Sequence, residues 1–229
     1  MAIDPETFSV EVSEGNSVTA LLYAAPKRDR AGVTLILGHG AGASQLHPFM
    51  RLFASGLAGR GLDVVTFNFL YMERGRGAPD QKAKLESCYS AVIGAACSLK
   101  KLKTNALVIG GKSMGGRIAS QVAAADTGSN LAGLVFLGYP LHPPGKPEQL
   151  RDAHLKDISA PMLFLQGTRD GFGTPEELRA VIKKSSPSAT FYVIEGGDHS
   201  FKVPKSVGVP QEEVYERAMD EIARWIKAR

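Results

Sequence analysis

Short apolar runs recur along the chain, and the way polar residues interrupt them predicts the secondary structure that each run forms. Residues 8–12 and 18–23 alternate apolar and polar side chains around a Glu14-Gly15-Asn16 turn, which predicts a pair of antiparallel strands. Six later runs are mainly apolar and predict further strands, and the first of them, at residues 33–37, is the kind of run expected of a strand that is buried on both faces of a sheet. They cover residues 33–37, 64–69, 106–109, 134–137, 162–166 and 191–194.

Amphipathic stretches separate these runs and predict helices. The expected helices cover residues 49–57, 82–102, 117–125, 175–184 and 211–227. The last helix carries an apolar stripe on one face, which indicates core packing rather than a cofactor site. Strands alternate with helices, and no linker or repeat divides the chain. The pattern predicts a single α/β domain over residues 1–229, with a doubly wound, mainly parallel sheet and helices on both faces.

The composition is that of an ordinary globular domain, with 229 residues, 44% hydrophobic and 22% charged. The formal net charge of +4 is scattered, and its densest cluster, at residues 100–103, is expected to end a helix rather than to bind nucleic acid. Cys88 and Cys97 are expected in that helix, about 13 Å apart along its axis, so we expect no disulfide between them. Because neither a signal peptide nor a spanning apolar run is visible, we expect a cytoplasmic protein without a membrane partner.

The strongest chemical motif follows the apolar run at residues 106–109, where the chain contains Gly111-Lys112-Ser113-Met114-Gly115. A serine with a glycine two residues away on each side, between a strand and a helix, is the pattern of a nucleophile elbow. The serine of such a turn occupies strained backbone space, and larger side chains in place of the glycines would clash with it. The motif predicts that Ser113 is the nucleophile of a serine hydrolase. The alternative is a glycine-rich turn that only lets a helix pack closely on a sheet.

An acid and a histidine follow Ser113 in the order that an elbow nucleophile requires. Asp170 lies in the loop between an expected strand and a helix start, where Thr174 and Glu177 are expected to form a capping box. His199 lies in the loop after the next expected strand. The carboxyl ends of parallel strands share one edge of the sheet, so we expect Ser113, Asp170 and His199 to meet there as a catalytic triad.

Two other acids lie close to His199 in the sequence. Asp198 is its direct neighbour, so its side chain is expected to point elsewhere and to cap the loop. Glu195 is a weaker alternative for the triad acid, because it lies too near the histidine along the chain.

Acyl transfer also needs two backbone N–H groups aimed at the substrate oxyanion. We expect one from Met114, the residue after the nucleophile, where the helix dipole assists. We expect the other from Ala41, with Gly40 as the near alternative, in the glycine-rich loop after the run at 33–37. His39 in that loop is expected to be structural rather than catalytic.

The remaining candidates are weaker. Tyr71, His142 and Gly40 are possible substrate contacts, and for His142 packing in a proline-rich loop is equally open. His47, His142 and His154 lack the spacing of metal ligands with one another or with cysteine, so we expect no metal site. The elbow also lacks the upstream glycine of a phosphate-binding loop, and we expect no cofactor.

The order of elbow, aspartate and histidine resembles the α/β-hydrolase superfamily over nearly the whole chain. Three stretches resemble more narrowly the dienelactone-hydrolase-like group that includes the Tex30 and KANL3 domains; they are Gly38-His39-Gly40-Ala41-Gly42, residues 111–117 and residues 139–145. The resemblance implies a compact hydrolase with minimal or no cap, and residues 138–161 are too few for a large helical cap. True dienelactone hydrolases use a cysteine where this chain has Ser113, so that activity is not carried over.

These observations favour a carboxylesterase or thioesterase that acts on a small-molecule acyl ester or thioester through an acyl-enzyme. A peptidase or an acyltransferase would use the same triad. An interaction module that keeps the fold with little catalysis is the alternative from another class. The sequence leaves the substrate and the oligomeric state open.

Overall fold

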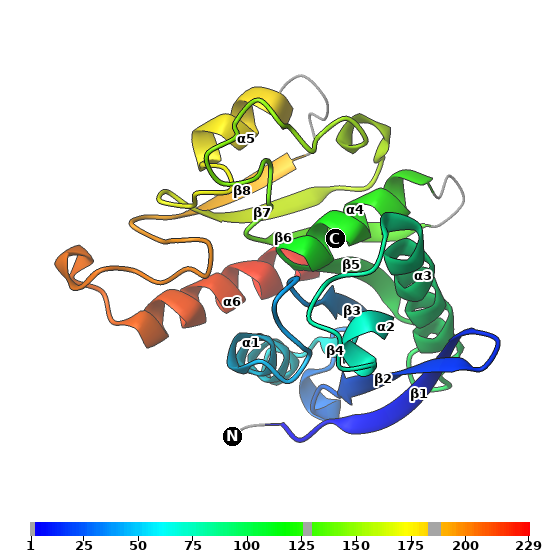
Figure 1. The fold of residues 1–229 in the computed structure, drawn as a ribbon. Coiled ribbons are helices and arrows are strands. Elements are labelled where there is room, and N and C mark those ends of the chain that lie inside the picture. The colour runs from blue at the N-terminus through cyan, green and yellow to red at the C-terminus, as the bar shows by residue number, and fades with distance from the viewer. Residues whose placement is uncertain (1–2, 126–129, 183–188) are drawn as a thin grey trace.

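The computed structural model describes residues 3–125, 130–182 and 189–229 and contains an eight-stranded sheet with helices on both faces (Figure 1). The strand order is β1-β2-β4-β3-β5-β6-β7-β8. The strands are β1 (Glu6–Ser13), β2 (Asn16–Tyr23), β3 (Val33–Gly38), β4 (Asp63–Phe67), β5 (Ala106–Lys112), β6 (Leu131–Leu137), β7 (Met162–Gly167) and β8 (Ala189–Ile194). The α-helices are α1 (Pro48–Gly59), α2 (Leu70–Glu73), α3 (Lys82–Ser98), α4 (Met114–Ala125), α5 (Pro175–Ile182) and α6 (Gln211–Lys227), and the short 3-10 helices are η1 (Lys27–Asp29), η2 (Leu155–Asp157) and η3 (Lys205–Val207).

The direction of the strands confirms the predicted fold class. β1 and β2 form the expected antiparallel pair, and β2 also runs antiparallel to β4. The remaining neighbours, from β4 through β3, β5, β6 and β7 to β8, are all parallel. Residues 138–161 contain one 3-10 turn, η2, and no larger helix, so no helical cap rises from this connection.

Two apolar cores hold the helices against the sheet. On one face α3, α4 and α5 bury Leu85, Ile118 and Leu178. On the opposite face α1 and α6 bury Phe53 and Ile222, the latter within the predicted stripe of the last helix. Each layer removes apolar side chains from water, which is the main free energy that favours this fold.

Two elements end earlier than expected. β4 ends at Phe67: the Asn68 N–H still donates to the Thr19 carbonyl of β2 at 3.1 Å, but its side chain accepts the Gln45 N–H at 3.0 Å and donates to Glu73 at 2.9 Å, both outside the sheet. α3 ends at Ser98 because Leu99 takes an extended conformation, with φ −64° and ψ 123°. The lysines at 100–103 therefore lie in a turn beyond the helix.

Other boundaries extend further than predicted. α4 begins at Met114, directly after the elbow serine, and β6 begins at Leu131. The last two residues of the helix expected over 175–184 lie outside the described residues, and so does the start of the predicted domain. Both cysteines lie in α3 as free thiols, Cys88 buried and Cys97 exposed.

Glycine is required where α4 crosses the sheet. A Cβ on Gly115, in the first turn of α4, would overlap the carbonyl group of Gly38 at the end of β3. A Cβ on Gly111 at the end of β5 would meet the same carbonyl oxygen. This close backbone approach brings the start of α4 against two strand ends, with Ser113 in the turn between β5 and the helix.

We predict that Gly115→Ala destabilises the protein by about 2 kcal/mol or more, because the added methyl group forces α4 away from the Gly38 backbone. Gly94→Ala is the matched control: Gly94 is also helical, and a Cβ there would meet nothing within 4 Å. This control should stabilise by up to about 1 kcal/mol through helix propensity. Urea unfolding of both variants measures the difference, and equal stability of the two would contradict the argument.

Candidate active site

Ser113 occupies the turn between β5 and α4 with a left-handed backbone, φ 51°. A non-glycine residue in this region is strained and persists only where the surroundings hold it. Here the Ser113 N–H donates to the Leu137 carbonyl at 3.1 Å, and the Arg117 N–H of α4 donates to the Ser113 carbonyl at 3.1 Å. The turn therefore fixes the serine between the sheet and the helix.

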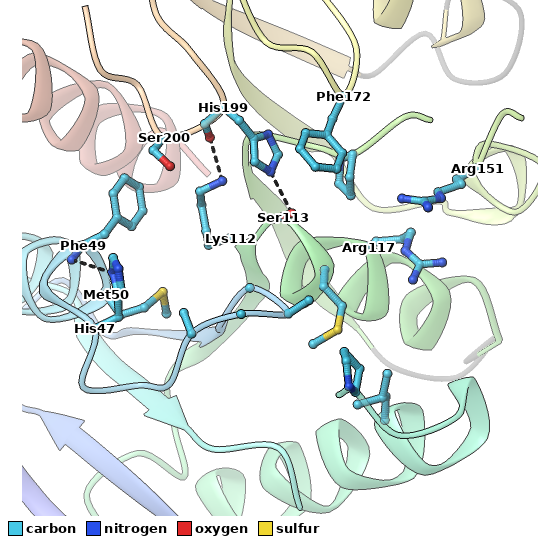
Figure 2. Close-up of a pocket in the computed structure, with 18 of the residues that line it drawn as sticks. His47, Phe49, Met50, Lys112, Ser113, Arg117, Arg151, Phe172, His199 and Ser200 are labelled. Carbon is cyan, nitrogen blue, oxygen red and sulfur yellow. Dashed lines mark hydrogen bonds between the residues drawn. The ribbon is translucent and has the colours of Figure 1, made fainter. Parts of the chain in front are cut away.

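The structure brings Ser113, His199 and Asp170 into one chain of hydrogen bonds. His199 Nε2 lies 2.8 Å from Ser113 Oγ, drawn as a dashed line in Figure 2, and His199 Nδ1 lies 2.8 Å from Asp170 Oδ2. A carboxylate accepts only, so Nδ1 carries the ring proton and Nε2 is left to accept from the serine hydroxyl. That tautomer is the one in which imidazole acts as a base toward the serine.

The Asp170 carboxyl group is buried, with 2% of the residue exposed. Besides the His199 ring, it accepts the Phe172 N–H at Oδ1 and the Gln166 side-chain amide at Oδ2, both at 2.8 Å. These bonds replace the water that a buried carboxylate loses. The network holds the carboxylate against the imidazole.

Gln166 is a residue that the sequence analysis missed. Its amide donates to Asp170 and, at 2.7 Å, to the Gly173 carbonyl, and its side-chain oxygen accepts the Tyr139 N–H at 2.8 Å. The sequence did contain a signal for this role: a glutamine stands near the end of an otherwise apolar strand. A buried amide needs hydrogen-bond partners for its polar atoms, so such a glutamine is expected to hold nearby polar groups. Its effect on Asp170 makes it a positioning residue.

Lys112 is a second residue without a predicted role. It is 9% exposed, and its ammonium group donates to the His199 carbonyl at 2.6 Å. Burial lowers its pKa to about 8, and the nearby Asp170 and Asp198 charges oppose this shift. Lys112 thus links the elbow to the backbone of the histidine loop, as Figure 2 shows.

The two competing acids have other partners. The Asp198 carboxylate accepts the N–H groups of Ser200 and Lys202 at 2.7 and 2.9 Å, which confirms its predicted role as a loop cap. Glu195 is exposed and accepts the Thr168 hydroxyl at 3.3 Å. Neither carboxylate is the partner of His199 Nδ1, which faces Asp170.

The loop after β3 lies beside the elbow. Its residues Gly40 and Ala41 line the same pocket as Ser113 and Met114. His39 holds the loop from below: its Nε2 accepts the Phe69 N–H at 3.1 Å, so its protonated Nδ1 donates to the Gly40 carbonyl at 2.8 Å. His39 is fully buried, as its expected structural role requires. The loop and the first turn of α4 thus line the same space beside the serine.

Tyr71 and His142 are not among the residues that line this pocket, which favours, for His142, the alternative of packing in the proline-rich loop. Tyr71 is fully buried, and its hydroxyl donates to the Ala41 carbonyl at 2.8 Å, which ties down the loop. The proline-rich loop turns His142 away, so its Nδ1 lies 2.9 Å from the Pro143 carbonyl. The His142 N–H still donates to the carbonyl of Phe172, whose ring packs on His199 with centroids 4.2 Å apart.

The pocket above Ser113 has a volume of about 540 Å³ and two unlike sides. Phe49 and Met50 of α1 form an apolar side, and Arg117 and Arg151 form a basic side (Figure 2). An apolar pocket with a few converging polar groups is typical of a small-molecule site.

Neither a metal centre nor a membrane span was found in the part of the chain that the structure describes. No three His, Cys, Asp or Glu side chains among residues 3–125, 130–182 and 189–229 come together as possible metal ligands. Among the helices of the same ranges, none has the length and hydropathy needed to span a bilayer.

Comparisons with known proteins agree with this architecture. Residues 31–227 match a family model described as an alpha/beta hydrolase domain. Among solved structures, an alpha-beta serine hydrolase homologue from Coxiella burnetii aligns with a TM-score of 0.76 at 20% identity over 98% of both chains. An α/β serine hydrolase without lid from Xanthomonas campestris aligns at 0.74 and 18% identity, over 98% of this chain and 96% of the other. An esterase from Pyrococcus furiosus aligns at 0.73 and 16% identity, over 98% and 92%. The narrower likeness to the Tex30 and KANL3 domains stays a prediction.

We predict that His39 makes stability fall in mild acid. Burial lowers its pKa from 6.5 to about 4, so between these pH values the unfolded chain takes up a proton that the folded chain does not. The free energy of unfolding therefore falls as the pH drops from 6.5 to 4, by up to about 3 kcal/mol from this residue. In His39→Gln, which cannot titrate, urea unfolding should show a shallower decline over the same range. An equal slope in both proteins would contradict the assignment.

Proposed function

The chain belongs to the alpha/beta hydrolase family, and on that basis we propose that it is a serine hydrolase that cleaves small-molecule esters or thioesters through an acyl-enzyme. The observation that supports this proposal most is the hydrogen-bonded chain from Ser113 through His199 to the buried Asp170. A serine hydroxyl becomes an effective nucleophile only when a positioned base takes its proton.

The first half of the reaction forms the acyl-enzyme. Ser113 Oγ attacks the carbonyl carbon of the substrate while its proton passes to His199 Nε2. Asp170 stabilises the imidazolium that results. The tetrahedral oxyanion accepts hydrogen bonds from the N–H groups of Met114 and Ala41, near the positive end of α4. The His199 imidazolium then protonates the leaving alcohol or thiol as its bond to carbon breaks.

The second half returns the enzyme to its starting state. Water enters, and His199 Nε2 takes one of its protons as the water oxygen attacks the acyl carbon. The second tetrahedral intermediate uses the same two N–H groups. When it collapses, the bond to Ser113 Oγ breaks and the serine recovers its proton from His199, which releases the carboxylic acid.

We predict that Ser113→Ala lowers the turnover of p-nitrophenyl acetate by about 10⁴-fold or more, because no nucleophile remains. Release of p-nitrophenolate measures the rate. A fluorophosphonate probe should label the unmodified protein once, at Ser113. Ser98→Ala, on the exposed face of α3, is the matched control and should keep full turnover. A folded protein that takes up no probe would instead support a role as an interaction module.

A comparison of Asp170, the expected triad acid, with Asp198, the loop cap, gives a second prediction. Asp170→Asn should lower kcat by about 10⁴-fold, because the amide no longer holds the imidazole in the reactive tautomer. Asp198→Asn is its control: both N–H groups that Asp198 binds contact Oδ1, which an asparagine oxygen replaces, so kcat should fall less than about tenfold. Steady-state kinetics separates the two. A larger loss from Asp198→Asn would reverse the assignment of the acid.

A further inference from the structure

The basic side of the pocket is built by two arginines from different parts of the fold. Arg117 lies in the first turn of α4, four residues after Ser113 in the chain, and its N–H donates to the Ser113 carbonyl at 3.1 Å. Arg151 lies in the connection between β6 and β7. Both side chains are half-buried and line the pocket, and Figure 2 shows them on the same side of Ser113.

The backbone that carries Arg151 is firmly held. Its N–H donates to the Leu141 carbonyl at 2.8 Å, and its carbonyl accepts the Tyr139 hydroxyl at 2.8 Å. Tyr139 itself is fully buried. Arg151 is therefore presented from a fixed position, as Arg117 is from the helix.

In the part of the chain that the structure describes, neither guanidinium group has a carboxylate partner. Within residues 3–125, 130–182 and 189–229, neither Arg117 nor Arg151 forms an ion pair within 4.0 Å, and the Arg117 Nε atom is buried without any hydrogen-bond acceptor. Other sheltered arginines of this chain are paired: Arg30 binds Asp63, and Arg60 binds Glu216 and Asp220. Among the arginines of the described residues that are not exposed, the two in the pocket therefore differ from the other two in lacking such a partner.

The two arginines lie close enough to repel each other, and two further charged residues, Lys82 and Asp80, line the same pocket. Burial and the nearby Arg117 charge both lower the pKa of Arg151, so the two cations repel each other in a partly desolvated place. Lys82 at the pocket rim is exposed and paired with Glu86 at 3.5 Å. Asp80 is the acidic residue of the rim, and within the described chain it forms no ion pair with either arginine. A bound anion would relieve the repulsion between the two guanidinium groups.

We propose that Arg117 and Arg151 bind an anionic group, a carboxylate or a phosphate, carried by the ester or thioester that Ser113 attacks. The guanidinium group presents a planar fork of donors that matches both anions. The remainder of the substrate would lie toward the apolar side of the pocket, at Phe49 and Met50. This inference rests on the proposed hydrolase function and names its substrate class.

The kinetic test compares matched pairs of esters. Mono-p-nitrophenyl glutarate and p-nitrophenyl pentanoate differ by an acyl-side carboxylate. On the alcohol side, 4-acetoxybenzoate and 4-acetoxyphenyl phosphate are each compared with phenyl acetate. In Arg117→Gln/Arg151→Gln, the ratio of kcat/KM for at least one anionic ester to its neutral counterpart should fall roughly tenfold or more. The ester that responds identifies the anion and the side that carries it.

Two variants control this test. Arg28→Gln makes the same change of charge at an exposed side chain that is not among the pocket residues, and its ratios should match those of the unmodified protein. Arg151→Lys, with Arg117 unchanged, keeps both positive charges. Its ratio of kcat/KM for the anionic to the neutral ester should therefore fall less than that of the double variant. If the double variant changes none of the three ratios, the proposed anion site is wrong although the hydrolase function stands.

A binding test does not depend on turnover. Glutarate or inorganic phosphate should raise the Tm of Ser113→Ala relative to sodium chloride of equal ionic strength, because a ligand that binds the folded state stabilises it. The same additions should not raise the Tm of Ser113→Ala/Arg117→Gln/Arg151→Gln. Equal Tm shifts in both proteins would overturn the anion site. A shift confined to the protein with both arginines, together with no probe labelling of unmodified protein, would overturn the hydrolase function alone.

Discussion

The close backbone contact between the first turn of α4 and the end of β3 is the constraint on which the rest of the site depends. Because Gly115 and Gly111 both lie against the Gly38 carbonyl, any larger side chain there would push the helix off the sheet. The contact fixes where the turn of Ser113 can lie, and the loop with Ala41 begins at the same crossing. Nucleophile and expected oxyanion donors are therefore positioned by one packing contact.

Two buried polar side chains hold His199, one at its ring and one at its backbone. The Asp170 carboxylate fixes the imidazole ring, and the Lys112 ammonium group holds the His199 carbonyl. Gln166 in turn fixes the carboxylate. A lowered pKa does not remove the lysine bond, because a neutral amine still carries N–H donors. The Asp170 side chain thus orients the His199 ring, and the Lys112 side chain holds the His199 backbone. Together these contacts limit the motion of His199 relative to Ser113.

The sequence predicted what depends on local pattern and chain order. The strands, the elbow and the sequence of Ser113, Asp170 and His199 follow from apolar runs, glycine spacing and the shared edge of parallel strands. Partners that are far apart along the chain could not be predicted: Lys112 meets a carbonyl 87 residues away, and Tyr71 faces inward to the Ala41 carbonyl. The end of α3 was also missed, because the extended backbone at Leu99 has no proline or glycine to announce it.

The absence of a helical cap over residues 138–161 shapes how this pocket can select a substrate. A substrate in an open pocket keeps part of its surface in water, so apolar burial contributes less to its binding than it would under a lid. Orientation then depends on fixed polar groups. Arg117 lies in the first turn of α4, and its N–H is bonded to the Ser113 carbonyl, so the backbone fixes where this arginine starts relative to the nucleophile. If the arginines hold the anionic group of the substrate, they also fix the position of its carbonyl group relative to Ser113. Binding energy is then used to place the carbonyl carbon correctly for attack.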